Sequence, residues 1–365
     1  MSEPDETRSG APREGETDSA EARGPAEGES AAVVPDQAAL QEGAAELRPE
    51  GPGEQEKKGG GLDKRAVLGP AIVLVALSLL YSYVIPLGYG PDEPRHYGFI
   101  RLLWGSGQLS RVLPDGRELG NAIAIHPPTY YFVEGVLWYP ARALGRVLAP
   151  HLKAGLARRL IVGAEPAPVP DELLDEAVAY RLLRLTSPLW GLATLLLVFA
   201  AVRRLMPSSP QVALGVAWVM ALWPHLLMNF ATITNDCGAD FAGALFVWYW
   251  ACRAPRGTGG WRHAAWAGAL AGLGGMMKGQ LLLCLTPVAY VALAWPYGRR
   301  FWADRRFWGQ AAVATVALLV IAGPWYARNF VLYGQLNYVA PGYQAIRAGM
   351  GFLDALMTGI VSQAL

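Results

Sequence analysis

Long uncharged apolar runs recur along most of this chain of 365 residues, and short polar segments separate them. The first run covers residues 66–87 and is long enough to cross a hydrocarbon core about 30 Å thick. Further apolar segments lie at 128–149, 182–202, 211–233, 239–252, 263–276, 279–297 and 310–327. The pattern predicts an all-α polytopic integral membrane protein, which excludes the soluble globular classes.

The first part of the chain has a different character. Residues 1–56 contain 15 of the 30 acidic residues, four arginines and no aromatic residue. Such a segment cannot bury enough apolar surface to offset the entropy of ordering. We therefore predict a disordered acidic tail over residues 1–62, a transmembrane domain over 63–340, and an incomplete C-terminal segment over 341–365.

Basic residues set the expected orientation. Lys57, Lys58, Lys64 and Arg65 precede the first apolar run, so the positive-inside rule keeps the tail in the cytoplasm and sends the loop 88–127 to the opposite side. The basic clusters at 203–204, 253–262 and 299–306 are also predicted to be cytoplasmic. Counted from the first span, however, the segments 128–149 and 182–202 give the wrong parity for a cytoplasmic pair at 203–204. Either one of these two segments lies along the interface or crosses only in part, or the arginine pair faces outward, and we favour a 128–149 segment that does not span.

The stretch 264–296 is too long for one crossing and is interrupted near Lys278 by glycines on both sides. It predicts two helices joined by a tight turn at that lysine. The three cysteines lack metal-ligand spacing and are interpreted as small core residues.

Two polar motifs lie at the ends of the loop 88–127. The first is Gly90-Pro91-Asp92-Glu93-Pro94-Arg95-His96-Tyr97, directly after the first span, and the second is His126-Pro127-Pro128-Thr129-Tyr130-Tyr131. An acid pair and a histidine where a membrane helix surfaces indicate polar chemistry at a bilayer face. The simpler alternative is that the two acids cap the helix that Pro94 begins.

Three later motifs complete a series. They are Thr234-Asn235-Asp236, Met277-Lys278-Gly279, and Trp325-Tyr326-Ala327-Arg328-Asn329-Phe330 followed by Tyr333-Gly334. In order and spacing, the five motifs resemble those of GT-C glycosyltransferases, in the branch of the protein mannosyltransferases, aminoarabinose transferases and RgtA/B/C/D-like proteins. The resemblance covers about residues 66–340 and implies a GT-C-like helical bundle.

This resemblance implies a sugar donor on a polyprenyl phosphate and transfer with inversion on the extracytoplasmic side of the plasma membrane. The acceptor is a hydroxyl on a glycan, a lipid or a protein. Besides the substrates, membrane lipids are the expected partners, and nothing indicates nucleic acid binding.

The resemblance also suggests roles for individual residues. Asp92 is the expected catalytic base, supported by Glu93 and His96. His126, Lys278 and Arg328 are candidates for binding the donor phosphate, although Arg328 could simply extend to the interface. A divalent cation is a candidate cofactor, held by Asp92, His96 and Asp236.

Two other functions remain open at this point. A transporter or lipid flippase would use the intramembrane Lys278 and the broken helices to line a path. An inactive, truncated GT-C-like scaffold would use the acidic tail to bind a partner. Catalysis requires the candidate residues to converge on one outer-face site, and a scaffold does not.

Overall fold

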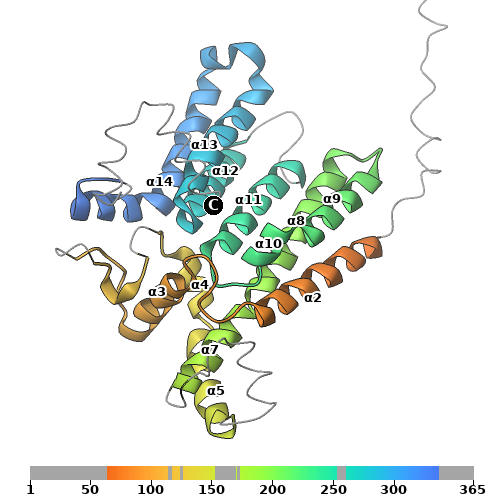
Figure 1. Ribbon diagram of the computed structural model, residues 1–365. Coiled ribbons are helices and arrows are strands. Elements are labelled where there is room, and N and C mark those ends of the chain that lie inside the picture. The colour runs from red at the N-terminus through yellow and green to blue at the C-terminus, as the bar shows by residue number, and fades with distance from the viewer. Residues whose placement is uncertain are drawn as a thin grey trace, which may run out of the picture. The chain divides into compact units, whose positions relative to one another are not determined.

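The computed structural model describes residues 64–113, 117–123, 126–152, 170, 173–252 and 260–336 (Figure 1). Throughout these residues the chain forms helices and loops and no strand, apart from one isolated bridge between Val112 and Glu118. The predicted all-α class is therefore confirmed. The predicted disordered tail and the C-terminal segment 341–365 lie outside the described residues.

Four stretches of the described chain are long and apolar enough to cross a membrane: Arg65–Val84, Leu174–Leu205, Gly279–Ala303 and Arg305–Tyr333. Each exceeds the roughly 17 residues that a crossing needs. Large apolar side chains remain exposed along them, among them Leu283, Val320 and Val331. The protein is therefore membrane-embedded, as predicted.

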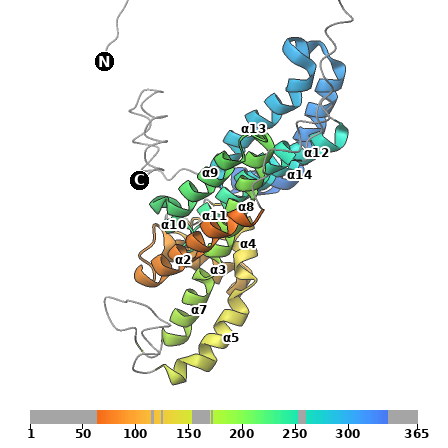
Figure 2. The same ribbon diagram turned by 90° about the vertical axis from the view of Figure 1, so that its right-hand side faces the viewer.

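One group of helices surrounds the first span. Helix α2 (Leu68–Val84), which follows η2 (Lys64–Val67), packs against α8 (Ser187–Leu205), α9 (Pro210–Leu222) and α10 (Pro224–Asn229). Helix α11 (Asn235–Cys252) lies along α8, as Figures 1 and 2 show. Leu74, Leu195 and Phe230 are fully buried in this group.

The apolar segment 211–233 forms two helices and not one. Helix α9 ends at Leu222, and α10 starts at Pro224 after an extended Trp223 (φ −78°, ψ 112°). A proline disfavours helical backbone at the residue before it and lacks the N–H that a continuous helix needs. The interruption leaves α9 with 13 residues.

A second group contains α12 (Trp261–Met277), α13 (Gly279–Ala294), η6 (Trp295–Ala303) and α14 (Arg305–Tyr333) (Figure 2). The predicted break at Lys278 is confirmed, because this residue alone is extended between α12 and α13 (φ −150°, ψ 128°). Helix α14 packs closely along α12: a Cβ on Gly268 would lie 1.9 Å from the carbonyl oxygen of Ala314. Small residues permit such close helix contacts in membranes.

The segment 128–149 forms two short helices, α4 (Thr129–Gly135) and α5 (Trp138–Leu148), followed by η4 (Ala149–His151). With seven and 11 residues, they are too short to cross a bilayer. Helix α5 instead lies beside α7 (Leu174–Arg184) (Figure 1). This agrees with the prediction that the segment does not span.

The polar loop after α2 contains α3 (Glu93–Ser106) and η3 (Leu119–Asn121). Helix α3 starts directly after Asp92, has Pro94 in its first turn, and ends at Gly107 in the left-handed conformation (φ 69°). Proline fits the first turn because its missing N–H has no helical partner there, and glycine adopts the left-handed end at little cost. This loop, α4 and the start of α11 carry the candidate site.

Candidate functional site

Glu93 forms a fully buried ion pair. Both its carboxylate and the guanidinium of Arg184 are 0% exposed. Arg184 donates from Nε to Oε1 at 2.6 Å and from Nη2 to Oε2 at 2.5 Å. The backbone N–H groups of Gly88, Gly90 and Ile233 donate to the same carboxylate at 3.2, 3.2 and 3.0 Å. These five bonds use the capacity of the carboxylate, which accepts about four hydrogen bonds in ideal geometry.

Arg184 also closes the end of α2. Its guanidinium donates to the carbonyl oxygens of Ser82, Ile85 and Pro86 at 3.0, 2.5 and 2.6 Å. Ser82 lies in the last turn of α2 and Ile85 is its C-cap, so two of these carbonyls are ones that a helix leaves without an internal partner at its C-terminus. The Glu93 carboxylate is therefore buried and saturated, and it ties α2, α3, α7 and the loop before α11 together, so any support that it gives to Asp92 acts through the backbone.

Asp92 has the opposite surroundings. Its side chain is 58% exposed and forms an ion pair with Arg95, with 3.2 Å between Oδ1 and Nη1. Asp92 occupies the N-cap position, but its side chain makes no capping hydrogen bond. Among the described residues it is the one non-glycine residue with positive φ (51°). Such a conformation is costly and clusters at functional sites, which favours the functional interpretation over simple capping.

Arg95 connects Asp92 to the end of the same loop. Its guanidinium binds the Glu118 carboxylate through Nε at 3.0 Å and through Nη2 at 2.7 and 2.8 Å. This forked geometry is strong and orients the arginine. Sequence reasoning missed Arg95, although its position three residues after Asp92 is a signal for contact on a helix.

His96 and His126 meet at one hydroxyl group. The Nδ1 atoms of His96 and His126 lie 2.7 and 3.3 Å from the Tyr131 hydroxyl oxygen, and the two imidazole rings are 5.5 Å apart. A hydroxyl has one proton, so Tyr131 can donate to only one ring and must accept from the other. Burial, reinforced by the charges of His126, Lys278 and Arg95, lowers the pKa of His96 well below its usual value.

Asp236 and Lys278 form a second ion pair of this region. Asp236 lies in the first turn of α11, and Lys278 is the extended residue between α12 and α13. The Asn235 side chain also donates to the carbonyl of Met277 at 3.1 Å. The break in the α12–α13 pair therefore turns a lysine toward the start of α11, which holds it in place.

His126 lies near enough to four charged side chains for their charges to act on its pKa. Burial is the main cause that lowers the pKa of His126 to about 4, and the positive charges of Lys278 and, more weakly, Arg95 lower it further. The negative charges of Asp236 and Asp92 raise this pKa in part. We call Asp92, His96, His126, Asp236 and Lys278 the central cluster. Five residues predicted from motifs far apart in the sequence thus come together in space.

No group of three or more His, Cys, Asp or Glu side chains is arranged to hold a metal ion within the described ranges. Each side chain of the predicted cation site has another partner: Asp92 binds Arg95, His96 binds Tyr131, and Asp236 binds Lys278. The geometry does not fit a divalent cation held by Asp92, His96 and Asp236.

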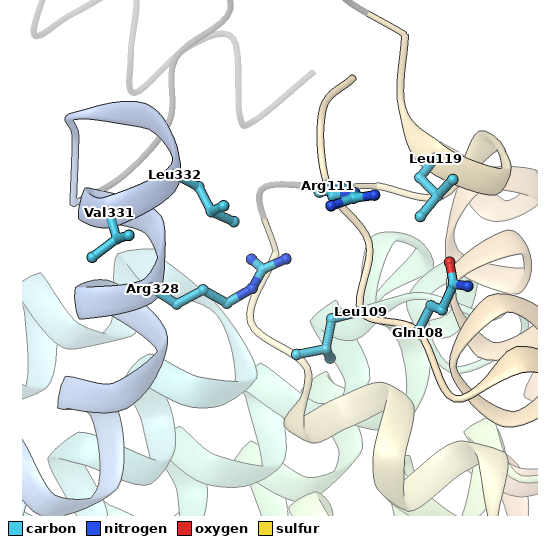
Figure 3. A pocket seen from close by; sticks show the side chains of 7 residues that line it. All are labelled: Gln108, Leu109, Arg111, Leu119, Arg328, Val331 and Leu332. Atoms are coloured by element: carbon cyan, nitrogen blue, oxygen red, sulfur yellow. The ribbon is translucent and has the colours of Figure 1, made fainter. Parts of the chain in front are cut away.

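Arg328 lies in a different place from the one expected. It extends from α14 into a cavity of about 520 Å³ beside the segment that follows α3 (Figure 3). Its Nη2 donates to the carbonyl of Ser110 at 2.8 Å, and its guanidinium stacks 4.7 Å from the centre of the Trp325 ring. The sequence grouped Arg328 with His126 and Lys278, whereas the structure places it with residues 108–111 and 119.

Glu134 is a further buried acid that the sequence did not single out for chemistry. It is 2% exposed and accepts from the Trp190 indole at 3.0 Å and from the Thr186 hydroxyl. Burial raises the pKa of Glu134 to about 7. Both of these hydrogen-bond donors are neutral, so Glu134 lies between α4 and α8 as a carboxyl group that is easily protonated.

Part of the chain is similar to a known protein family. Residues 178–326 match the model of the dolichyl-phosphate-mannose-protein mannosyltransferase family. No curated protein and no solved structure matches the chain. The matched region contains Asp236 and Lys278, whereas Asp92, His96 and His126 precede it. The match agrees with the resemblance seen in the motifs and supports a membrane glycosyltransferase of GT-C type.

Proposed function

We propose that this protein transfers a sugar from a polyprenyl-phosphate donor to a hydroxyl group of a glycan, lipid or protein on the extracytoplasmic side of the plasma membrane. The family match supports a membrane glycosyltransferase of GT-C type. The observation that carries the finer proposal is the central cluster, in which an exposed carboxylate, two neutral imidazoles and a lysine come from α3, the segment before α4, α11 and the α12–α13 break.

In this proposal Asp92 is the general base. As the acceptor hydroxyl attacks the anomeric carbon, its proton passes to the Asp92 carboxylate and a new C–O bond forms. The bond from the anomeric carbon to the phosphate oxygen breaks, and the phosphate leaves with the electron pair, so configuration inverts. The exposure of Asp92 suits this role because the carboxylate must reach a substrate proton within hydrogen-bond distance.

Lys278 and His126 are proposed to bind the departing phosphate. Lysine acts as a point charge toward phosphate. His126 is neutral near pH 7, because its pKa lies at about 4, and it can therefore act as a hydrogen-bond donor without adding charge. His96 is a positioning residue, since its contact with Tyr131 orients the hydroxyl that also meets His126.

A transfer assay tests the proposal. Membranes containing the wild-type chain or the Asp92→Asn variant are supplied with polyprenyl-phosphate sugars labelled in the sugar, and label transferred to non-donor products is counted. Loss of a general base lowers the rate by about 100-fold or more. Asp175→Asn is the matched control, because Asp175 is an acid on α7 paired with Arg142.

Retention of full transfer by Asp92→Asn would remove the central residue from the mechanism. Absence of transfer in the wild type with every polyprenyl-phosphate sugar supplied would favour the transporter or scaffold alternatives.

A further inference from the structure

Another cavity lies at the end of α13, where η6 connects this helix to α14. Its volume of about 570 Å³ falls within the range of small-molecule sites. Four aromatic side chains and one guanidinium group line it, together with aliphatic and small residues. The aromatic residues are Tyr290, Trp295, Phe301 and Phe307, and the guanidinium belongs to Arg299. A ligand for this cavity therefore needs apolar surface and a group that a guanidinium binds.

The inner wall of the cavity is packed, and its outer wall is open. Phe307 is 4% exposed, and its ring lies 4.9 Å from the ring of Phe301 in an edge-to-face contact. On the outer side, Val291 and Trp295 are 63% and 80% exposed. Both belong to the stretch Gly279–Ala303, which is long and apolar enough to cross a membrane. An apolar chain that enters from the bilayer would cover these exposed side chains.

Positive charge is in excess around this cavity. Residues 295–306 contain four arginines and one acid. The acid, Asp304, caps α14 by accepting from the backbone N–H of Arg306 at 2.7 Å. Within the described ranges, the side chains of Arg299, Arg300, Arg305 and Arg306 form no ion pair. A guanidinium that no carboxylate neutralises presents forked donors that match a phosphate group.

The cavity is remote from the central cluster. Lys278 directly precedes α13, whereas the cavity lies at the other end of that helix. A helix of 16 residues is about 24 Å long. Figure 1 likewise shows the connection between α13 and α14 away from α3 and α4. The cavity therefore lies toward the membrane surface opposite the proposed transfer site, and it is separate from the phosphate site proposed at Lys278 and His126.

We infer that this cavity binds one anionic phospholipid of the leaflet opposite the central cluster. Arg299 binds the lipid phosphate, and an acyl chain lies along Val291 and Ala294 of the cavity wall. Basic pockets between membrane helices bind anionic head groups in this way. The sequence placed Arg299 only in a basic cluster that sets orientation. The inference does not depend on sugar transfer, so it holds or fails separately from the proposed function.

The aromatic walls alone would also suit a different head group, the quaternary ammonium of phosphatidylcholine, because cations bind the faces of aromatic rings. The charges argue against this ligand. Arg299 is part of the wall, Arg300 follows it, and neither has a carboxylate partner within the described part of the chain. Because like charges repel, a head group with a net negative charge is favoured over one that carries a cation.

Lipid binding to the purified full-length protein in a neutral detergent, measured by native mass spectrometry, tests the inference. The probes are phosphatidylglycerol, phosphatidylcholine with the same acyl chains, and glycerol phosphate as the head group without chains. Arg299→Gln removes the charge, and Ala294→Phe fills the cavity without changing the charge. Arg204→Gln is the matched control, because it removes the same charge from an exposed arginine in the last turn of α8 that does not line this cavity.

We expect the wild type to prefer phosphatidylglycerol over phosphatidylcholine by about tenfold, because hydrogen bonds to charged groups are strong. Arg299→Gln should lose most of this preference, Ala294→Phe should bind phosphatidylglycerol more weakly than the wild type, and Arg204→Gln should match the wild type. Glycerol phosphate should bind far more weakly than the whole lipid, since it lacks the apolar chains.

An unchanged preference in Arg299→Gln would overturn the inference, as would an equal loss of preference in Arg204→Gln, which would indicate a diffuse attraction to the basic surface. Tighter binding of phosphatidylcholine by the wild type would show that the aromatic rings hold a cation instead. Glycerol phosphate that binds as tightly as phosphatidylglycerol would show a site for free phosphate and not for a lipid.

Discussion

Asp92 and Glu93 are neighbours in one motif, and the structure gives them opposite surroundings. Glu93 is 0% exposed and bound by Arg184 and three backbone N–H groups, whereas Asp92 is 58% exposed and touches Arg95. The difference indicates that the two acids have different roles. The buried acid holds the ends of α2 and α3 in register, and the exposed acid is presented to a substrate.

The buried pair explains how Asp92 keeps a costly backbone conformation. A non-glycine residue at φ 51° persists only where the surrounding structure over-determines it. The backbone of the preceding turn is tied to Glu93 through the N–H groups of Gly88 and Gly90. The scaffold around Glu93 and the exposed central cluster should therefore respond differently to mutation.

Glu93→Gln should have the largest effect on stability. Removing one partner of a buried ion pair leaves Arg184 charged and uncompensated, which costs about 3–5 kcal/mol. The measurement is thermal unfolding of the purified protein in detergent, with Asp92→Asn beside it. Asp92→Asn should change stability by less than about 1 kcal/mol, since exposed ion pairs contribute little. Equal stability of Glu93→Gln and wild type would contradict the structural role.

Gly268→Leu should have the next largest effect, because the α12–α14 contact also belongs to the scaffold. A Cβ on Gly268 would lie 1.9 Å from the carbonyl oxygen of Ala314, so the helices must separate. Overpacking of this kind costs about 1–3 kcal/mol. Gly215→Leu in α9 is the matched control, because a Cβ there meets nothing within 4 Å. If both variants melt at the same temperature, the close contact is not present.

Glu134→Gln should change how the stability of the scaffold depends on pH. The pKa of Glu134 is raised from 4.5 to about 7, so its contribution is present at low pH and is lost as the pH rises through about 7. The glutamine amide does not ionise, so the variant does not lose this stability as the pH rises. We expect the variant to be more stable than the wild type at pH 8 and similar at pH 5, as measured by melting temperature. A variant less stable at pH 8 would contradict the assignment.

His126→Asn should have the smallest effect on stability. The pH dependence should run in the opposite direction to that of Glu134→Gln. The pKa of His126 is lowered from 6.5 to about 4, so its contribution is present above about pH 6.5 and is lost as the pH falls toward 4. The variant should show a flatter decline of melting temperature between pH 6.5 and 4. An identical decline in variant and wild type would show that His126 is not buried in its neutral form.

Much of the fold and part of the site could be predicted from the sequence. The break at Lys278 was visible because glycines flank a charged residue inside an apolar run. The order of the motifs brought Asp92, His96, His126, Asp236 and Lys278 into one hypothesis, and the structure groups them. Tyr131 was visible only as part of a motif, since its role as a bridge depends on side-chain geometry.

The remaining features depend on contacts between distant parts of the chain. Glu93 and Arg184 are 91 residues apart, and no local pattern indicates that an arginine at the start of an apolar segment binds a carboxylate in an earlier loop. Arg95 and Glu118 pair across the loop in the same way. The contacts of Arg328 with Ser110 and Trp325 could not be predicted, because a motif gives the order of residues along the chain and not the direction in which a side chain extends from a long helix.

The most direct test of the central claim measures stability and transfer on the same purified samples of Asp92→Asn and Glu93→Gln. We predict that Asp92→Asn unfolds at the wild-type temperature but transfers sugar from the polyprenyl-phosphate donor about 100-fold more slowly or less. Wild-type transfer by a folded Asp92→Asn protein would contradict the division of roles between the two acids.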